Sequence, residues 1–141
     1  MSRLGVMVNP TSGKRTGALI GTRAVELLRA AGEDVVDLSA PDASTAERRG
    51  RAAIAGGAID TLVVAGGDGM VHLGANLCAG TSVTLGVVAA GTGNDIAREL
   101  GLPVRDADLA VERILAGRTR RVDAARHTTG TGEERWFLGV L

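Results

Sequence analysis

Residues 61–77 have the sequence TLVVAGGDGMVHLGANL, in which an apolar run leads into three glycines around one aspartate. The apolar run 62–65 is typical of a buried strand, and the sequence from Met70 onward is compatible with a helix. Glycines permit positive φ and carry no Cβ, so successive N–H groups can converge on an anion where the helix begins. The stretch therefore predicts a strand–loop–helix unit that binds phosphate or, alternatively, a tight turn in which Asp68 caps its own helix.

Asp68 has a different meaning under each interpretation. A carboxylate repels a bound phosphate unless it holds a cation or orients a hydroxyl group, and both are tasks of phosphoryl transfer. Under the first interpretation Asp68 is therefore a candidate catalytic residue. Under the second interpretation its role is structural only.

A second unit of the same kind lies downstream. The apolar run 84–90 ends in Gly-Thr-Gly-Asn-Asp at residues 91–95, and the first apolar run, 4–8, ends in a polar loop at residues 9–17. Alternating strands and helices predict a parallel sheet, whose right-handed crossovers place these loops at one carboxyl edge, where ligands bind. A dinucleotide fingerprint is a poor fit because Ile96 replaces its last glycine, and a Walker A loop is excluded because Val8 replaces its first.

The remaining periodicity predicts one α/β domain. We expect strands over 4–8, 34–38, 62–65, 84–90 and 119–123, and helices over 18–31, 47–55, 70–78, 96–100 and 106–116. A further apolar strand begins at Trp136 and runs to the last residue, which we interpret as a truncated chain.

Composition restricts the classes of function. The chain has 141 residues, a formal net charge of zero and only two aromatic residues, so we expect no nucleic-acid partner. The single cysteine, Cys78, excludes a disulfide framework, and no signal peptide or membrane-spanning run is present, so a cytoplasmic protein is expected. Arg120 and Arg121 either protect a strand edge or contact an anionic membrane surface at the periphery.

Three motifs together resemble a known family. They are Asn-Pro-Thr-Ser-Gly at 9–13, Gly-Gly-Asp-Gly at 66–69 and Gly-Thr-Gly-Asn-Asp at 91–95, and their order and separation resemble the diacylglycerol kinase catalytic domain family. That family includes bacterial diacylglycerol kinases, YegS-type lipid kinases and sphingosine kinases. The resemblance implies a three-layer, parallel-sheet nucleotide-binding domain similar to NAD kinase and phosphofructokinase. It assigns 1–135 to this ATP-binding domain and 136–141 to the start of a C-terminal β-rich domain that is otherwise missing.

The resemblance also implies which residues bind ATP and Mg²⁺. Asp68 and Asp95 would be the catalytic residues and the magnesium ligands, orienting the γ-phosphoryl group for in-line attack by a lipid hydroxyl. Thr45 precedes the second predicted helix, at a place where the family often has a threonine that contacts the nucleotide. It is a weaker match than the other residues. The other residues implied to bind the nucleotide are Asn9, Ser12, Gly13, Gly66, Gly67, Gly69, Thr92, Gly93 and Asn94.

The implied function is transfer of the γ-phosphoryl group of ATP to a lipid hydroxyl, with diacylglycerol as the favoured acceptor. Because the family's lipid pocket and acidic base lie in the C-terminal domain, this chain alone is expected to be inactive. Two departures from the family pattern matter: Met70 stands where a threonine is usual, and Leu73 stands where many members have glutamate. A non-catalytic nucleotide-binding module and an NAD kinase-like enzyme therefore remain alternatives, and a homo-oligomer is left open.

Overall fold

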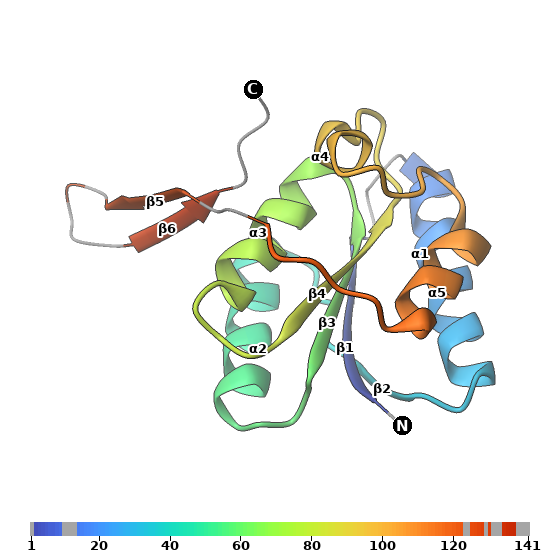
Figure 1. The fold of residues 1–141 in the computed structure, drawn as a ribbon, viewed down its shortest axis with the longest axis horizontal. Helices are drawn as coiled ribbons and strands as arrows, with labels where there is room; N and C mark the ends of the chain where they lie inside the picture. Colours follow the sequence, from blue (N-terminus) through green and yellow to red (C-terminus); the bar gives the residue numbers. More distant parts are fainter. Residues whose placement is uncertain (1, 10–13, 123–124, 129, 131–133, 138–141) are drawn as a thin grey trace.

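The computed structural model describes residues 2–9, 14–122, 125–128, 130 and 134–137. Its centre is a parallel sheet of four strands in the order β2-β1-β3-β4, with helices on both faces (Figure 1). A separate antiparallel pair, β5 and β6, projects from one side of this body. The elements in chain order are β1 (Arg3–Val8), α1 (Lys14–Ala30), β2 (Asp34–Asp37), α2 (Ala43–Ala55), β3 (Thr61–Gly66), α3 (Asp68–Cys78), β4 (Thr84–Ala89), α4 (Asp95–Glu99), α5 (Ala107–Ala116), β5 (Ala125–Thr128) and β6 (Glu134–Phe137).

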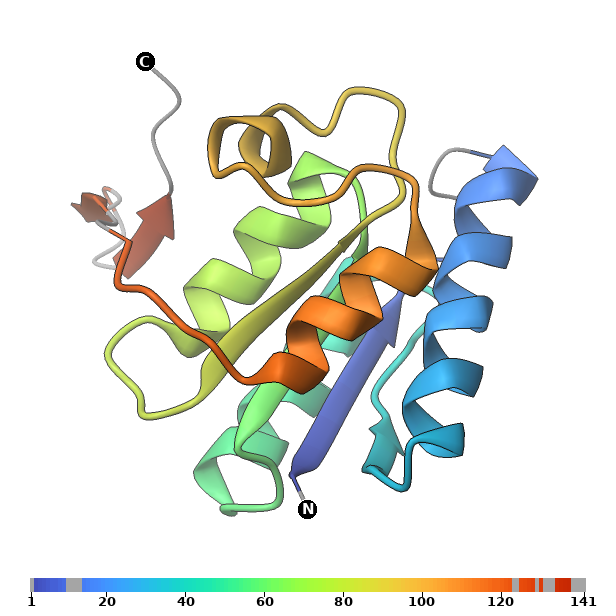
Figure 2. The same cartoon turned by 45° about the vertical axis from the view of Figure 1, so that its right-hand side comes forward.

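The register of the sheet brings the ends of three strands into line. Ala65 of β3 pairs with Val8 of β1 on one side and with Val88 of β4 on the other. The strands are parallel, so their carboxyl ends meet at one edge, which is the upper edge in Figure 2. The glycine-rich loops after β3 and β4 therefore begin side by side, as the sequence predicts.

Two apolar layers enclose the sheet. Val63 faces the layer formed with α1 and α5, whereas its neighbours Leu62 and Val64 face the layer formed with α2 and α3. All three side chains are fully buried. Because β3 is covered on both faces, its sequence is a continuous apolar run rather than an alternating one. The three-layer α/β fold is thus confirmed.

Cys78 is buried in the layer beside α2 and α3. Burial raises the pKa of its thiol to about 12, since the thiolate would lose its hydration there. The thiol stays protonated at neutral pH and serves as a small apolar side chain.

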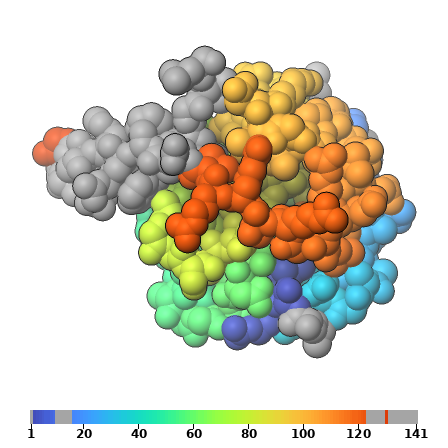
Figure 3. Space-filling model, in the orientation of Figure 1, coloured from blue at the N-terminus to red at the C-terminus, as the bar shows by residue number. Residues whose placement is uncertain are grey.

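The structure differs from the sequence-based elements in several places, among them the start of α1 at Lys14 instead of residue 18 and the unpredicted strand β5. Two further differences have a clear physical cause. α2 begins at Ala43 rather than Glu47, because Asp42 caps the helix by accepting the N–H of Thr45. The predicted strand over 119–123 is wrong: described residues 118–122 have no regular structure and cross the surface as the orange-red segment in Figure 3. Its one apolar residue, Val122, is 43% exposed, so burial gives this segment no reason to join the sheet.

The predicted boundary between residues 135 and 136 falls inside β6, and this division into domains stays a prediction. In the part of the chain that the structure describes, no helix has the length and apolar character needed to cross a membrane.

Candidate functional site

A cleft of about 570 Å³ lies at the carboxyl edge of the sheet. It is bordered by the end of β1, the start of α2 and the two glycine-rich loops. The lining residues are Asn9, Ala43, Gly67, Asp68, Gly69, Met70, Leu73, Gly91, Thr92 and Gly93. Six of the predicted site residues therefore come together in one cleft, namely Asn9, Gly67, Asp68, Gly69, Thr92 and Gly93. Predicted residues Ser12 and Gly13 lie outside the described residues.

The first corner, residues 66–69, presents backbone donors. α3 begins at Asp68 with Gly67 as its N-cap, and no side chain caps it. The first N–H groups used within the helix belong to Met70 and Val71, which both donate to the carbonyl of Gly67. The N–H groups of Asp68 and Gly69 are thus not used by the helix, and they lie at its positive end beside the cleft. This arrangement suits a bound anion.

The second corner, residues 91–95, is held together from within. Asn94 has a left-handed backbone, with φ of 58°, and only 2% of its surface is exposed. Its side-chain oxygen accepts the N–H of Gly91 at 2.9 Å, and its side-chain nitrogen donates to the carbonyl of Gly91 at 2.8 Å. The side chain of Asn94 therefore fixes the shape of this loop, and its contact with a nucleotide stays a prediction.

The two corners touch each other through their backbones. A Cβ placed on Gly91 would lie 2.5 Å from the Cα of Gly67, so only glycine fits at this contact. The carboxylate of Asp68 crosses the same boundary and accepts the N–H groups of Asp95 at 3.0 Å and Ile96 at 2.9 Å. Asp68 therefore caps α4 and not its own helix, which corrects the alternative interpretation of this residue.

The two carboxylates lie on the same side of the second corner. A Cβ on Gly93 would be 3.6 Å from Oδ2 of Asp68 and 4.0 Å from Oδ2 of Asp95. Asp95 is exposed, and each oxygen of Asp68 keeps a lone pair beyond its bond to α4. Among the described residues there is no cluster of three or more histidine, cysteine, aspartate or glutamate side chains. Such a donor set fits Mg²⁺ held by one or two carboxylates together with phosphate oxygens, not a metal enclosed by protein.

Three of the residues that line the cleft are apolar, and they include both departures from the family pattern. They are Ala43, Met70 and Leu73. Met70 also packs against the first corner, because a Cβ on Gly66 would lie 2.6 Å from the Cγ of Met70. A thioether side chain thus occupies the space beside the predicted phosphate loop.

Thr45 is not placed as the sequence indicates. It lies inside the first turn of α2 and is absent from the residues that line the cleft. Its hydroxyl donates to Asp42 at 3.1 Å and accepts from Arg48 at 3.3 Å. The bonds from the Thr45 N–H and hydroxyl lower the pKa of the Asp42 carboxyl, so in this structure Thr45 serves the cap of α2.

Comparison with known families accounts for this arrangement of loops. The model of the diacylglycerol kinase catalytic domain matches residues 3–127. The chain belongs to this family. Its members include the diacylglycerol kinase of Mycobacterium tuberculosis, which is 36% identical over 137 residues, and that of Bacillus subtilis, which is 31% identical over 125 residues.

The matches cover most of this chain but less than half of its relatives. The Mycobacterium protein is matched over 97% of this chain and 44% of its own length, and the Bacillus subtilis protein over 87% and 41%. A crystal structure of a diacylglycerol kinase from Bacillus anthracis str. Sterne superposes with a TM-score of 0.72 at 26% identity, over 87% of this chain and 42% of that one. The chain therefore spans somewhat under half the length of these family members.

Sequence reasoning missed one residue that supports the family's cleft. The guanidinium of Arg105 donates to the carbonyls of Ala90 and Gly91 at 3.1 and 2.7 Å. Nothing in the spacing marks this residue, because it follows the motif at residues 91–95 by ten positions and belongs to the segment that leads to α5.

Proposed function

We propose that this chain is the ATP-binding part of a lipid kinase, which transfers the γ-phosphoryl group of ATP to a hydroxyl group of a lipid, with diacylglycerol as the acceptor. One observation carries the proposal: backbone donors at the start of α3 and the carboxylate of Asp68 line a single cleft, and the carboxylate of Asp95 lies close to Gly93 at its border. The names of the relatives, which are diacylglycerol kinases, support the choice of lipid.

In this proposal the first corner binds the phosphates. The N–H groups of Asp68 and Gly69 point from the end of a helix of 11 residues, whose dipole favours negative charge at this end. The absence of side chains on Gly67 and Gly69 lets phosphate oxygens approach the backbone closely. Asn9, at the end of β1, lines the same cleft and is positioned to contact the nucleotide.

The second corner positions charge in this proposal. Asp95 is exposed at the first position of α4, and Asp68 holds that helix by bonds to two of its N–H groups. Bound Mg²⁺ would neutralise charge on the phosphates. The contribution of the chain is to hold the two carboxylates in a fixed relation to the phosphate donors, since positioning and charge stabilisation dominate phosphoryl transfer.

The direct test is an assay of the complete protein with Mg-ATP and separate vesicles of diacylglycerol, sphingosine or another lipid alcohol. We expect a phosphorylated product from diacylglycerol. Asp95→Asn should abolish turnover and lower the melting temperature only slightly, because its carboxylate is exposed. The proposal would be refuted if the complete protein phosphorylated none of these lipids.

A non-catalytic nucleotide-binding module is the second candidate, and the position of Met70 beside the first corner favours it. Such a module would bind Mg-ATP and release it unchanged with every acceptor. An NAD kinase-like enzyme would instead turn over ATP only when NAD is present, so NAD belongs in the same panel of acceptors.

The proposed partners are the nucleotide, the lipid substrate and the surface of the membrane that contains it. Arg118, Arg120 and Arg121 are exposed on the segment after α5, where basic side chains can approach anionic lipids. Sedimentation of the complete protein with vesicles containing phosphatidylglycerol tests this contact. Binding that falls as salt rises would support it, and equal binding to neutral vesicles would contradict it.

A further inference from the structure

Arg105 supports the second corner from outside the cleft. Its backbone N–H donates to the carbonyl of Ala89 at 2.7 Å, and its guanidinium donates to the carbonyls of Ala90 and Gly91. One residue thus binds three consecutive carbonyl groups where β4 leaves the sheet. β4 is the last strand on this side of the four-stranded sheet, and among the described residues only the bridge between Ala89 and Val104 continues the pairing.

The backbone of Arg105 is itself unusual. Its φ is 53°, a left-handed conformation that is costly for a residue with a side chain. The preceding residue, Val104, forms a parallel bridge with Ala89. These contacts offset the cost and direct the guanidinium toward the corner.

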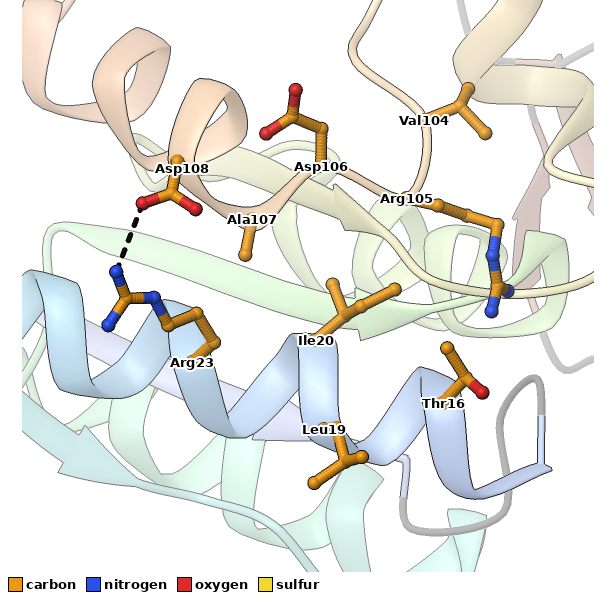
Figure 4. Close-up of a pocket in the computed structure, with 9 residues that line it drawn as sticks. All are labelled: Thr16, Leu19, Ile20, Arg23, Val104, Arg105, Asp106, Ala107 and Asp108. Atoms are coloured by element: carbon orange, nitrogen blue, oxygen red, sulfur yellow. Dashed lines mark hydrogen bonds and ion pairs between the residues drawn. The ribbon is translucent and has the colours of Figure 1, made fainter.

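Arg105 belongs to a different cavity from the nucleotide cleft. It lines a second cavity of about 490 Å³, between α1 and the segment that leads to α5, and it does not line the cleft (Figure 4). In that cavity Arg23 pairs with Asp108 at 3.3 Å. Within the part of the chain that the structure describes, Arg105 forms no ion pair, so its donors are directed to the carbonyls of the corner.

The bond to the Gly91 carbonyl fixes the direction of the next N–H group. In a trans peptide the C=O and the following N–H point in opposite directions, and no described peptide bond is cis. With the Gly91 carbonyl turned toward Arg105, the N–H of Thr92 is turned away from Arg105. Thr92 lines the nucleotide cleft, which Arg105 does not line.

We propose that Arg105 is a positioning residue that holds the 91–92 peptide so that the N–H of Thr92 faces the phosphates of the nucleotide. The inference rests on the proposed function for the identity of the ligand. Arg105 touches no substrate in this arrangement and acts only through the backbone of the second corner.

The test compares Arg105→Gly, Arg105→Ala and Arg105→Lys in the complete protein. Glycine removes the guanidinium but favours the left-handed backbone, so it separates the role of the side chain from backbone strain. We expect the dissociation constant for Mg-ATP and the KM for ATP to rise about tenfold in Arg105→Gly, with an unchanged KM for the lipid. Arg105→Lys should recover part of the loss, because it retains one charged donor.

Arg113→Ala is the matched control, because Arg113 also donates to a backbone carbonyl, that of Gly101 at 3.0 Å, but it is far from the cleft residues in the chain and is exposed. It should leave both KM values unchanged. An Arg105→Gly protein that binds Mg-ATP as tightly as the wild type, or one in which both KM values rise equally, would overturn the inference.

Amide hydrogen exchange separates this inference from the proposed function. Exchange at residues 90–95 should be at least about tenfold faster in Arg105→Gly than in the wild type, whether or not a nucleotide is present. Unchanged exchange would overturn the positioning role even if the protein is a kinase. Failure of the wild type to bind Mg-ATP would instead refute the proposed function, and with it the assigned ligand.

Discussion

The two glycine-rich corners follow neighbouring strands and have similar sequences, yet they are stabilised in opposite ways. The first, residues 66–69, has no side-chain cap, and a Cβ on Gly69 would meet nothing within 4 Å. The second, residues 91–95, is braced by the buried amide of Asn94, by Arg105 and by the carboxylate of Asp68. The first corner has no side chain that holds it in place, whereas the second is held by side chains from three positions.

The difference shows that glycine content alone does not identify a phosphate-binding loop. In the first corner glycine leaves the donors of α3 accessible. In the second, glycine at position 91 is required by the contact with the backbone of Gly67. The same substitution, glycine to alanine, should therefore have very unequal effects in the two corners.

The largest effect is expected for Gly91→Ala. Its Cβ would collide with the backbone of Gly67, which cannot move aside as a flexible side chain can. We expect the free energy of unfolding to fall by about 3 kcal/mol or more. Gly69→Ala is the matched control: it adds a methyl group in open space within α3, where alanine favours the helix by up to about 1 kcal/mol. Equal denaturation midpoints for the two variants would contradict the difference between the corners.

Asn94→Ala should have the next largest effect. It removes the acceptor for the Gly91 N–H and one of the two donors to the Gly91 carbonyl, in a residue that is 2% exposed. We expect a loss of about 2–3 kcal/mol, measured by urea denaturation. Asn94→Gly should recover about 1 kcal/mol of that loss, since glycine tolerates the positive φ. If the two variants are equally stable, backbone strain contributes nothing at this position.

Asp68→Asn and Asp95→Asn should separate structure from chemistry. An amide at position 68 turns one NH₂ group toward an N–H of α4, so we expect a loss of about 1–2 kcal/mol. Asp95 is exposed at the start of α4, and its neutralisation should cost about 0.5 kcal/mol or less. Both variants should lose lipid kinase turnover. Normal turnover in Asp68→Asn would remove this residue from the proposed mechanism.

The smallest effect is expected for Met70→Thr, which gives the first corner the side-chain donor that it lacks. Met70 lines the cleft beside Gly66, so a hydroxyl at this position lies near the proposed phosphates. Mg-ATP should bind about threefold more tightly, which calorimetry can measure. Met70→Val is the control for side-chain shape without a hydroxyl group. If the valine variant also binds Mg-ATP more tightly, the gain comes from the smaller side chain and not from a hydrogen bond.

Much of the fold was accessible from sequence for a simple physical reason. Strands such as β1 and β3 are buried on both faces, so their apolar runs are continuous and are bounded by glycine or asparagine. The strand predicted at 119–123 failed because its pattern is mainly polar, and a polar pattern carries no burial signal to confirm or exclude pairing. The structure begins α2 four residues before the predicted one, because Asp42 is the cap and residues 43–46 contain no large apolar side chain that marks them as helical.

The convergence of the two corners was predictable, but their bonding was not. Parallel topology places the loops after β3 and β4 at one edge whatever their side chains. By contrast, the bond from the Ile96 N–H to Asp68 joins residues 28 positions apart, and a local pattern cannot show which helix a carboxylate caps. The same holds for Arg105, whose role depends on a left-handed backbone conformation that the local sequence does not predict.

The contact between Gly67 and Gly91 has a kinetic consequence. Because the two described corners are already joined through their backbones and through Asp68, an incoming ligand does not have to order them. The entropic penalty of association is then small at this part of the cleft, and capture need not wait for a conformational rearrangement. Differences in affinity among ligands that contact only these corners should accordingly appear in their dissociation rate constants.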